Sequence, residues 1–508
     1  MNEFHSEAPS GSASAESHAS SGPSHPRLRF SVALSGPVSI GDARVALINH
    51  LTAQKKGGTW LLRLDDSHPE KTTPETVQGL YDDLKWLKIE WQEGPDRPGK
   101  AGPYRQSERG DLYQQHLRQL LEQGKAYPCY CTPEKLDEEK RRFLSAGKPP
   151  RYTGTCRALT PEARAEFESQ GLKPLIRLKV DRQIVKFRDG VYGDFTVDSD
   201  TIGDWVLALA DGRPTPNFVA VVDDALMKIN QVIRAENELS TTATQILLYR
   251  SFGWEAPSYA HIPLVLGADR TLLSKKHGLS TVQDLRERGF LPPAVLHYLI
   301  QLGTNFVEGR RFPKWDELAQ QFGIERIQRS SPIFDENELK RINAQYLRQL
   351  GEEEFLALAE KYVPTYGEIV REKGDEWTRA TLLSLREKCR TFQEVGDYLR
   401  ELTRAPEAFT DDAKKALALK DAPRLLKILT EDLSQAPVLN LDSISDLMEN
   451  AKQKLKSKNK NVFGSLQAAL TGATEGHDLP LLVSLLGKEE CLKRIQYALT
   501  TLQHAPAK

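Results

Sequence analysis

The order of predicted elements near the N-terminus most constrains the fold. Residues 27–34 form an apolar, β-prone segment, and residues 35–37 (Ser-Gly-Pro) end it. Residues 40–54 repeat apolar side chains at helical spacing, residues 60–64 have the pattern of a second strand, and residues 73–87 that of a second helix. When a helix joins two strands of one sheet, the strands run parallel and the crossover between them is right-handed. The sequence therefore predicts an α/β fold built on a parallel sheet.

The two halves of the chain have different patterns. In a parallel sheet, ligands bind beyond the carboxyl ends of the strands, so residues 35–42 and 65–68 are the first candidates for a binding site. Beyond about residue 335 the strand pattern fades, and apolar residues recur at helical spacing. We expect an all-α half there, with helices over 338–350, 381–402 and 489–499.

Composition excludes some classes of protein. The chain has 508 residues, which is enough for several domains. Its net charge is −1, so the overall charge does not indicate nucleic-acid binding. A local basic face can still bind RNA. Mean hydropathy is −0.49 and no apolar run approaches the ~20 residues of a membrane span, so we expect no membrane partner. Residues 1–26 are rich in small and polar residues without an apolar core, which predicts a disordered tail rather than a signal peptide.

Three of the five cysteines cluster in the sequence, namely Cys129, Cys131 and Cys156. An odd number of cysteines in a long chain suits a reduced, cytoplasmic compartment rather than a disulfide scaffold. Three sulfurs fit tetrahedral zinc, so the cluster is a candidate metal knuckle. The alternative is three thiols without a metal.

Two further segments suit phosphate chemistry. Ser39-Ile40-Gly41-Asp42 opens the first predicted helix, and Leu272-Leu273-Ser274-Lys275-Lys276-His277-Gly278 follows roughly 230 residues later. A helix N-terminus presents N–H groups and a positive dipole end to phosphates, and glycine permits close approach. In this order and spacing the two segments resemble the signature loops of class I aminoacyl-tRNA synthetases. The alternative is that the lysines belong to a solvated surface loop.

The resemblance extends over roughly nine-tenths of the chain. From Leu28 to near the end, the sequence is similar to bacterial glutamyl-tRNA synthetases. Each matching stretch is weak alone, but their order and spacing agree as well. The matching stretches are residues 102–109, 124–132, 211–215, 221–224, 232–236, 252–255, 469–472 and 486–489.

This resemblance implies an architecture. It implies a Rossmann-type class I synthetase catalytic domain with an inserted acceptor-stem-binding domain, followed by an all-α anticodon-binding half. The expected parts are a tail (1–26), the first half of the catalytic domain (27–110), the insert (111–200), the second half of the catalytic domain (201–262), the lysine loop with a stem-contact region (263–334) and the anticodon-binding domain (335–508).

The resemblance also implies an ATP site. Lys275 aligns with the catalytic lysine, which neutralises charge on the leaving pyrophosphate. Gly41, Ser274 and Lys276 join Lys275 as ATP-binding residues. Ser39 stands where the family has its catalytic histidine, and its hydroxyl is shorter and uncharged. Losing such a donor commonly costs on the order of 3 kcal/mol in the barrier.

One further position in each signature segment also departs from the family pattern. Asp42 adds a carboxylate beside the expected phosphates, and Leu272 replaces the first lysine of the second signature. A carboxylate suits the positive end of a helix but repels a phosphate.

The expected amino acid pocket combines retained and altered positions. Arg29 and Arg234 match the two family arginines around the glutamate carboxylates, and a guanidinium grips a carboxylate in a fork. The alternative is that both arginines make ordinary salt bridges. Asp65 stands for the family glutamate that binds the substrate ammonium group. Three polar contacts are lost at Ala33, Pro216 and Ala220.

For the metal, the resemblance adds a fourth ligand. Some relatives bind zinc through Cys-x-Cys, a tyrosine oxygen and a further cysteine, which corresponds here to Tyr152 completing the set of Cys129, Cys131 and Cys156. Ala158 fills the position where other relatives have a histidine ligand. The zinc would be structural and would hold the acceptor-stem insert.

The implied function is that of a glutamate–tRNA ligase using ATP with Mg²⁺, glutamate and tRNA(Glu), and acting as a monomer. Residues 452–460 are lysine-rich and suit phosphate contacts, although a solvated helix end explains them equally well. The altered signature positions keep a second reading open. In that reading the chain is a divergent paralogue that binds tRNA with little or no charging, or that charges an unusual tRNA.

Overall fold

The computed structural model describes residues 25–33, 36–67, 72–148, 150–305, 315–437, 439–455, 463–474 and 478–503. Of the predicted tail, only His25 and Pro26 are described, and Pro26 is buried. Residues 456–460 of the lysine-rich run also lie outside the described part. The chain forms two compact units, one of residues 1–283 with 296–335 and one of residues 284–295 with 336–508. The six-part division above is finer than these units and stays a prediction.

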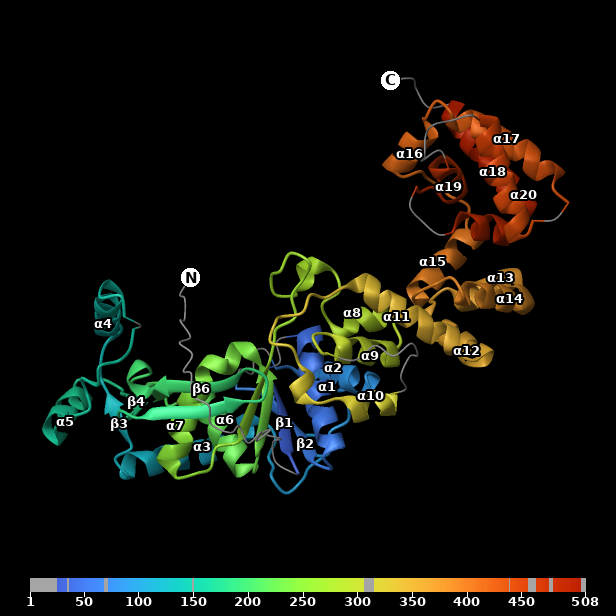
Figure 1. Cartoon of the computed structure of the whole chain (residues 1–508). Helices are drawn as coiled ribbons and strands as arrows, with labels where there is room; N and C mark the ends of the chain where they lie inside the picture. Colours follow the sequence, from blue (N-terminus) through green and yellow to red (C-terminus); the bar gives the residue numbers. More distant parts are fainter. Residues whose placement is uncertain are drawn as a thin grey trace, which may run out of the picture. The chain divides into compact units, whose positions relative to one another are not determined.

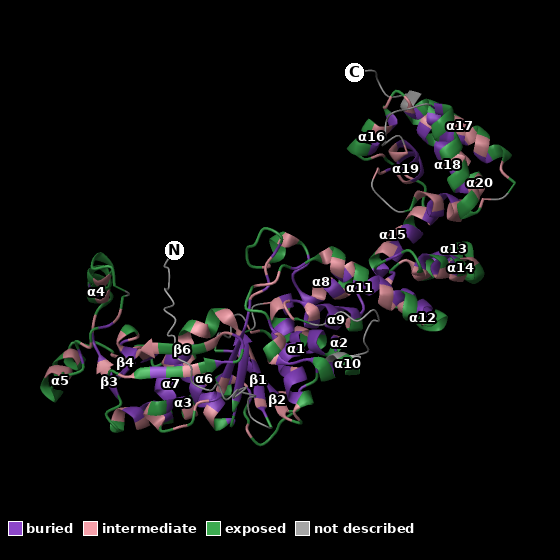
Figure 2. Cartoon of the chain, in the orientation of Figure 1, coloured by how far each residue is buried: buried purple, intermediate pink, exposed green. Residues whose placement is uncertain are grey.

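The predicted parallel strand pair is confirmed. β1 (Arg27–Ala33) and β2 (Thr59–Asp65) pair in parallel over their full length, and α1 (Ile40–Lys55) connects them (Figure 1). The five central residues of β2 are buried (Figure 2). Strand ends Ala33 and Asp65 are partners in the ladder, so the loops that follow both strands start at one edge of the sheet.

A second parallel pair continues this arrangement. β8 (Gln231–Ala235) and β9 (Ser258–Ile262) run parallel, with α6 (Pro216–Leu226) and α7 (Thr242–Phe252) before and after β8. The backbone amide of Asn230 donates to the carbonyl of Arg27 at 3.2 Å, which places β8 beside β1.

Antiparallel strands join this core. β5 (Ile184–Asp189) and β6 (Gly193–Asp198) form a hairpin, and β5 also contacts β9 in parallel. A separate sheet combines β3, β4 and β7, all antiparallel. Its strands are Ala126–Cys129, Leu175–Leu178 and Val206–Ala208.

The second unit is helical over its described residues, as expected beyond residue 335. The first predicted helix there corresponds to α11 (Glu336–Gln349). The continuous helix predicted over 381–402 is wrong, because the structure has α14 (Asp375–Arg386) and α15 (Phe392–Thr403). Thr391 starts the second helix by accepting the Glu394 amide at 3.2 Å, so a Thr-x-x-Glu cap outweighs the continuous apolar spacing.

The last helix, α20 (Leu479–Gln503), contains the predicted segment 489–499 and is interrupted at Gly487, where φ is +76°. With α16 (Asp411–Leu417), α17 (Ala422–Gln435), α18 (Leu441–Leu455) and α19 (Gly464–Thr471), it encloses the hydrophobic core of the C-terminal helices (Figure 1). No helix in the described part of the chain is long and apolar enough to cross a lipid bilayer.

The remaining helices are α2 (Pro74–Trp86), α3 (Gly110–Glu122), α4 (Pro133–Ser145), α5 (Pro161–Ser169), α8 (Val282–Glu287), α9 (Pro292–Gln301), α10 (Trp315–Gln321), α12 (Glu352–Tyr362) and α13 (Tyr366–Lys373).

One carboxyl group in α15 gives the helical unit a pH-dependent stability. Burial, followed by the negative charge of Asp397, raises the pKa of Glu401 to about 7. The folded state therefore binds this proton more tightly than the unfolded state, and stability falls as the pH rises from about 4.5 through 7. We expect Glu401→Gln to raise the unfolding temperature of the full chain at pH 8.5 by about 2–4 °C and to leave it unchanged at pH 4.5.

Thermal unfolding followed by circular dichroism at the two pH values measures this difference. The exposed Glu431→Gln is the matched control and shifts neither curve. An equal shift from Glu401→Gln at both pH values would contradict the titration.

Candidate active site

The two signature segments lie side by side in the first unit. The amide of Ile40 donates to the carbonyl of Ser280 at 2.9 Å, and the amide of Val282 donates to the carbonyl of Val38 at 2.9 Å. Ser39 and Thr281 form an antiparallel bridge between them. Segments far apart in the sequence therefore meet where helix α1 begins. The lysine loop comes directly before the bridge residue Thr281.

Ser39 caps α1. Its hydroxyl accepts the amide of Asp42 at 3.0 Å and donates to the Asp42 carboxylate at 2.6 Å. The hydroxyl hydrogen is thus engaged within the first helical turn, and the Asp42 charge lies at the positive end of the helix. At Gly41, an added Cβ would meet only the Ser39 Oγ, at 3.7 Å, so the backbone is open to close approach.

Asp269 organises the lysine loop. Its carboxylate receives the Lys276 ammonium and the His277 Nε2–H, each at 2.9 Å. The opposite ring nitrogen of His277 accepts the amide of Ser274 at 3.0 Å, which fixes the tautomer. Hydrogen bonds from Thr271, followed by those from Lys276 and His277, hold the pKa of Asp269 below its usual range.

The two lysines of the loop have different environments. Lys276 is tied to Asp269, whereas Lys275 is exposed and has no ion pair with any described residue. Both lie in η4 (Lys275–His277), a 3₁₀ turn that follows Ser274. Of these two lysines, Lys275 is therefore the one available to a ligand.

A buried charge cluster joins β1, β2, α6 and a short 3₁₀ helix. Two aspartates of α6, Asp223 and Asp224, meet Arg29 from β1, Arg63 from β2 and Arg109 from η1 (Gln106–Arg109). The Arg63–Asp224 and Arg109–Asp223 distances are 2.7 and 2.6 Å. Burial alone would raise the pKa of Asp224, but the charges of Arg29 and Arg63 outweigh it and keep the pKa low.

The charges of this cluster do not balance. Three guanidinium groups against two carboxylates leave one positive charge in a buried place. Arg29 donates only its Nε–H to Asp224, at 3.2 Å from Oδ1 and 3.3 Å from Oδ2. Its terminal nitrogens have no hydrogen-bond partner among the described residues. An uncompensated buried charge is costly, so this arrangement suits an anionic ligand at Arg29.

Arg234 lies near Arg29, at the end of β8. After burial, the positive charge of Arg29 is the largest cause that lowers the pKa of Arg234. Its Nε donates to His261 Nε2 at 3.0 Å, and the opposite ring nitrogen of His261 contacts Asp189 at 2.6 Å. Arginine has no acceptor, so His261 carries its hydrogen on Nδ1, and burial lowers the pKa of His261. The structure thus brings both predicted arginines together.

Of the other predicted pocket residues, Asp65 and Ala33 lie at the carboxyl ends of β2 and β1. Asp65 ends β2 and accepts the Ser67 hydroxyl at 2.8 Å. Ala33 is its ladder partner, and Pro216 and Ala220 belong to α6, the helix that also carries Asp223 and Asp224.

The predicted metal ligands also come together. The sulfur atoms of Cys129, Cys131 and Cys156 lie within 4.8 Å of one another. The Tyr152 hydroxyl oxygen is 3.4 Å from the sulfur atoms of Cys129 and Cys131. The guanidinium of Arg177 stacks on the Tyr152 ring at 4.0 Å, which places a cation beside this group. A hydrogen bond from Cys156 holds the pKa of Cys129 below its usual range.

Sequence analysis missed several members of the site. It noted Asp223 and Asp224 only as part of a matching stretch, although two adjacent acids in an apolar helix are a signal of buried ion pairs. It did not single out Arg63, Asp269 or Glu238, whose roles depend on contacts with residues distant in space or on loop geometry.

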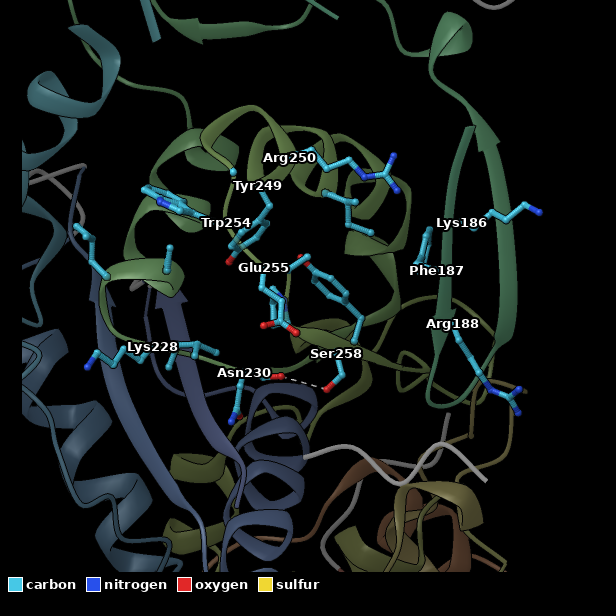
Figure 3. A pocket seen from close by; sticks show the side chains of 18 residues that line it. Lys186, Phe187, Arg188, Lys228, Asn230, Tyr249, Arg250, Trp254, Glu255 and Ser258 are labelled. Atoms are coloured by element: carbon cyan, nitrogen blue, oxygen red, sulfur yellow. Dashed lines mark hydrogen bonds between the residues drawn. The ribbon is translucent and has the colours of Figure 1, made fainter. Parts of the chain in front are cut away.

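A hollow of about 1140 Å³ lies elsewhere, at the amino ends of β8 and β9 (Figure 3). Lys186, Lys228, Arg250 and Trp254 line it, together with Glu255. None of the predicted site residues lines this hollow. The candidate active site is instead the edge at the carboxyl ends of the parallel strands.

Two family models match the chain. A catalytic-domain model of class I tRNA synthetases (E and Q) covers residues 27–341, and an anticodon-binding-domain model covers residues 354–499. The glutamate–tRNA ligase 2 of Caldanaerobacter subterraneus is 36% identical over 481 residues, which are 94% of this chain and 99% of that protein. The glutamate–tRNA ligase 2 of Syntrophus aciditrophicus is 36% identical over 474 residues, 93% of this chain and 98% of that protein.

Solved structures agree. A crystal structure of a glutamate tRNA ligase from Elizabethkingia meningosepticum, in complex with its amino acid, has a TM-score of 0.69 and 28% identity, and the match covers 94% of this chain and 99% of that one. The glutamate–tRNA synthetase of Elizabethkingia anophelis has a TM-score of 0.70 at the same identity, over 94% of this chain and 100% of that one. With both domains matched and relatives aligned over nearly the whole length, the chain belongs to the glutamate–tRNA ligase family of class I tRNA synthetases.

Proposed function

We propose that this chain is a glutamate–tRNA ligase, which activates glutamate with ATP and transfers it to the 3′ end of tRNA(Glu). The observation that carries the proposal is the unbalanced positive charge of the buried cluster, which leaves the terminal nitrogens of Arg29 to a carboxylate ligand. A planar guanidinium suits two-point recognition of a carboxylate. Family membership supplies the class of reaction.

In the proposed site, Arg29 and Arg234 hold the side-chain carboxylate of glutamate, and Asp65 pairs with its ammonium group. The α-carboxylate attacks the α-phosphorus of ATP. A new O–P bond forms, and the bond to the bridging oxygen breaks, so the electron pair leaves with pyrophosphate. A tRNA hydroxyl then attacks the activated carbonyl carbon, and AMP departs.

ATP takes part with Mg²⁺, which reduces the charge of the phosphates. Gly41 and Ser274 place the nucleotide against the start of α1, and Ser39 keeps this helix end capped. Lys275 neutralises charge on the leaving pyrophosphate. Lys276 adds a second positive charge while its contact with Asp269 shapes the loop.

We also propose a tRNA-bound arrangement in which the insert meets the acceptor stem and the C-terminal helices meet the anticodon. Residues 452–455, the described part of the lysine-rich run, belong to the end of α18. The Lys454 ammonium contacts Asp432 at 2.6 Å and the Lys452 ammonium contacts Glu449 at 3.3 Å, so both described lysines of this run already have a partner in the chain. The enzyme acts as a monomer in the cytoplasm.

A structural zinc ion fits the cysteine cluster. Tetrahedral zinc with Zn–S bonds of about 2.3 Å separates its sulfur ligands by about 3.8 Å. The three sulfur atoms here lie within 4.8 Å of one another, and Cys131 and Cys156 are 3.5 Å apart. The Tyr152 oxygen supplies the fourth ligand, and the ion holds β3 to the loop that contains Cys156.

One observation favours the alternative that this chain is a paralogue that binds tRNA without charging it efficiently. The Ser39 hydroxyl hydrogen, at the position of the family histidine, is engaged by Asp42. Aminoacylation of total bacterial tRNA with labelled glutamate and ATP separates the two readings. Robust charging supports the ligase, whereas tRNA binding without charging supports the paralogue.

The same assay tests Arg29. We expect Arg29→Gln to raise the KM for glutamate by about 100-fold or more, because a ligand carboxylate would lose its charged partner in a buried site. Arg27→Gln is the matched control on the same strand, since Arg27 pairs with Glu93 at 2.7 Å. A similar KM for both variants would contradict the role given to Arg29.

The two loop lysines provide a second test. We expect Lys275→Ala to lower the rate of adenylate formation by about 100-fold or more, because the lost cation faces the leaving group. Lys276→Ala should lower it less than about tenfold, because Lys276 is already paired with Asp269. Pyrophosphate exchange in the presence of tRNA measures both, and the reverse order of effects would refute the assignment.

The zinc proposal predicts metal content. The purified chain should contain about one zinc ion, measured by inductively coupled plasma mass spectrometry, and Cys131→Ser should lose it. Cys389→Ser is the control, because Cys389 is a buried cysteine of the helical unit and is not part of the cluster, so the zinc should stay in place. A metal-free wild type purified without chelators would rule the ion out.

A further inference from the structure

The guanidinium of Arg234 is fully engaged by the protein itself. Its five N–H groups have five acceptors among the described residues. The acceptors are His261 Nε2 at 3.0 Å, Gln245 Oε1 at 3.1 Å, Thr242 Oγ1 at 2.9 Å, the Glu238 carbonyl at 3.2 Å and the Glu238 carboxylate at 3.2 Å. An arginine has five donors and no acceptor, so no N–H of Arg234 is left for a ligand.

Four of these acceptors are fixed in the protein, and the fifth is free to move. Gln245, Thr242 and His261 are buried, and the Glu238 carbonyl belongs to the backbone of η3 (Glu236–Thr241). The Glu238 carboxylate is the exception, because its side chain is 50% exposed while that of Arg234 is only 8% exposed. A half-exposed carboxylate can move into water at little cost, whereas the buried acceptors cannot.

Arg29 provides the contrast within the same site. Its Nε is held by Asp224, and its terminal nitrogens have no described partner. Arg29 therefore has terminal N–H groups left for a ligand carboxylate, whereas all the N–H groups of Arg234 already have acceptors in the chain.

We propose that Glu238 is an internal competitor for the substrate carboxylate at Arg234 and that it sets the affinity of the amino acid pocket. This inference rests on the proposed function. Glutamate binds by displacing the Glu238 carboxylate into solvent and taking its place on Arg234 Nη1. The apparent dissociation constant is then the intrinsic one divided by the fraction of molecules in which Glu238 has left.

Such competition acts equally on every ligand that takes the place of Glu238, whereas Arg234 itself distinguishes ligands by charge. A carboxylate ligand replaces one ion pair with another, so the exchange is nearly balanced. A neutral ligand such as glutamine would remove Glu238 from Arg234 without supplying a negative charge. This difference between the ligands lies in their own contact with Arg234, so Glu238 lowers the affinity for both by the same factor.

The test is a calorimetric titration of the full-length wild type and of Glu238→Gln and Glu238→Ala with glutamate and, separately, with glutamine. We expect both variants to bind glutamate about two- to fivefold more tightly, as expected for the loss of one half-exposed ion pair. The ratio of glutamate to glutamine affinity should stay the same in both, because either ligand needs the same displacement of Glu238. In aminoacylation, the change should appear in the KM for glutamate and not in the KM for ATP.

Glu255→Gln is the matched control. Glu255 is an exposed glutamate of the same unit that lines the hollow at the opposite ends of β8 and β9 (Figure 3), and its substitution should leave both affinities unchanged. Glutamate binding that is unchanged or weakened in both Glu238 variants would overturn the inference, because Glu238 would then only hold Arg234 in place.

Failure of the underlying function has a different signature. If neither the wild type nor any variant binds or charges glutamate, the proposed function fails and this inference fails with it. Thermal unfolding of each variant accompanies the titrations, and a variant with an unchanged unfolding temperature and weaker glutamate binding counts against the inference.

Discussion

Two adjacent aspartates organise the catalytic half of this chain. Asp223 and Asp224 sit on one helix and receive arginines from β1, β2 and η1, so one pair of carboxylates fastens three elements that are distant in the sequence. Removing either carboxylate would leave guanidinium groups buried without partners, which is among the most destabilising changes a core can suffer. The same cluster fixes the backbone positions from which Arg29 and the loops after β1 and β2 reach the site.

The sequence was sufficient for the parallel strand pair, the helical C-terminal half and the meeting of the two signature segments, because each depends on local periodicity or on an ordered set of motifs. It was insufficient where one short-range signal competes with another. Periodicity over 381–402 suggested one helix, but the cap at Thr391 divides it. The six-part domain division and the assigned roles of the site residues remain predictions.

Partnerships across the fold were the hardest to foresee. That Arg63 shares Asp224 with Arg29, or that Asp269 binds both Lys276 and His277, follows from three-dimensional placement and leaves no periodic trace. The altered signature positions gain meaning in the same way. Ser39 and Asp42 form a closed pair in the first turn of α1, so the two departures from the family pattern are one local unit rather than two separate losses.

The lysine loop is anchored at both ends. Leu266 exchanges backbone hydrogen bonds with Pro332 and Phe334, and Ser280 is bonded to Ile40 at the start of α1. Between these anchors, Asp269 joins Lys276 and His277, and Gly267 lacks the Cβ that would approach the His277 ring within 2.4 Å. A loop bound in this way loses most of its conformational entropy when the chain folds. If Lys275 binds ATP as proposed, capture of the nucleotide requires ordering of little more than the Lys275 side chain, so electrostatics govern binding more than loop closure does.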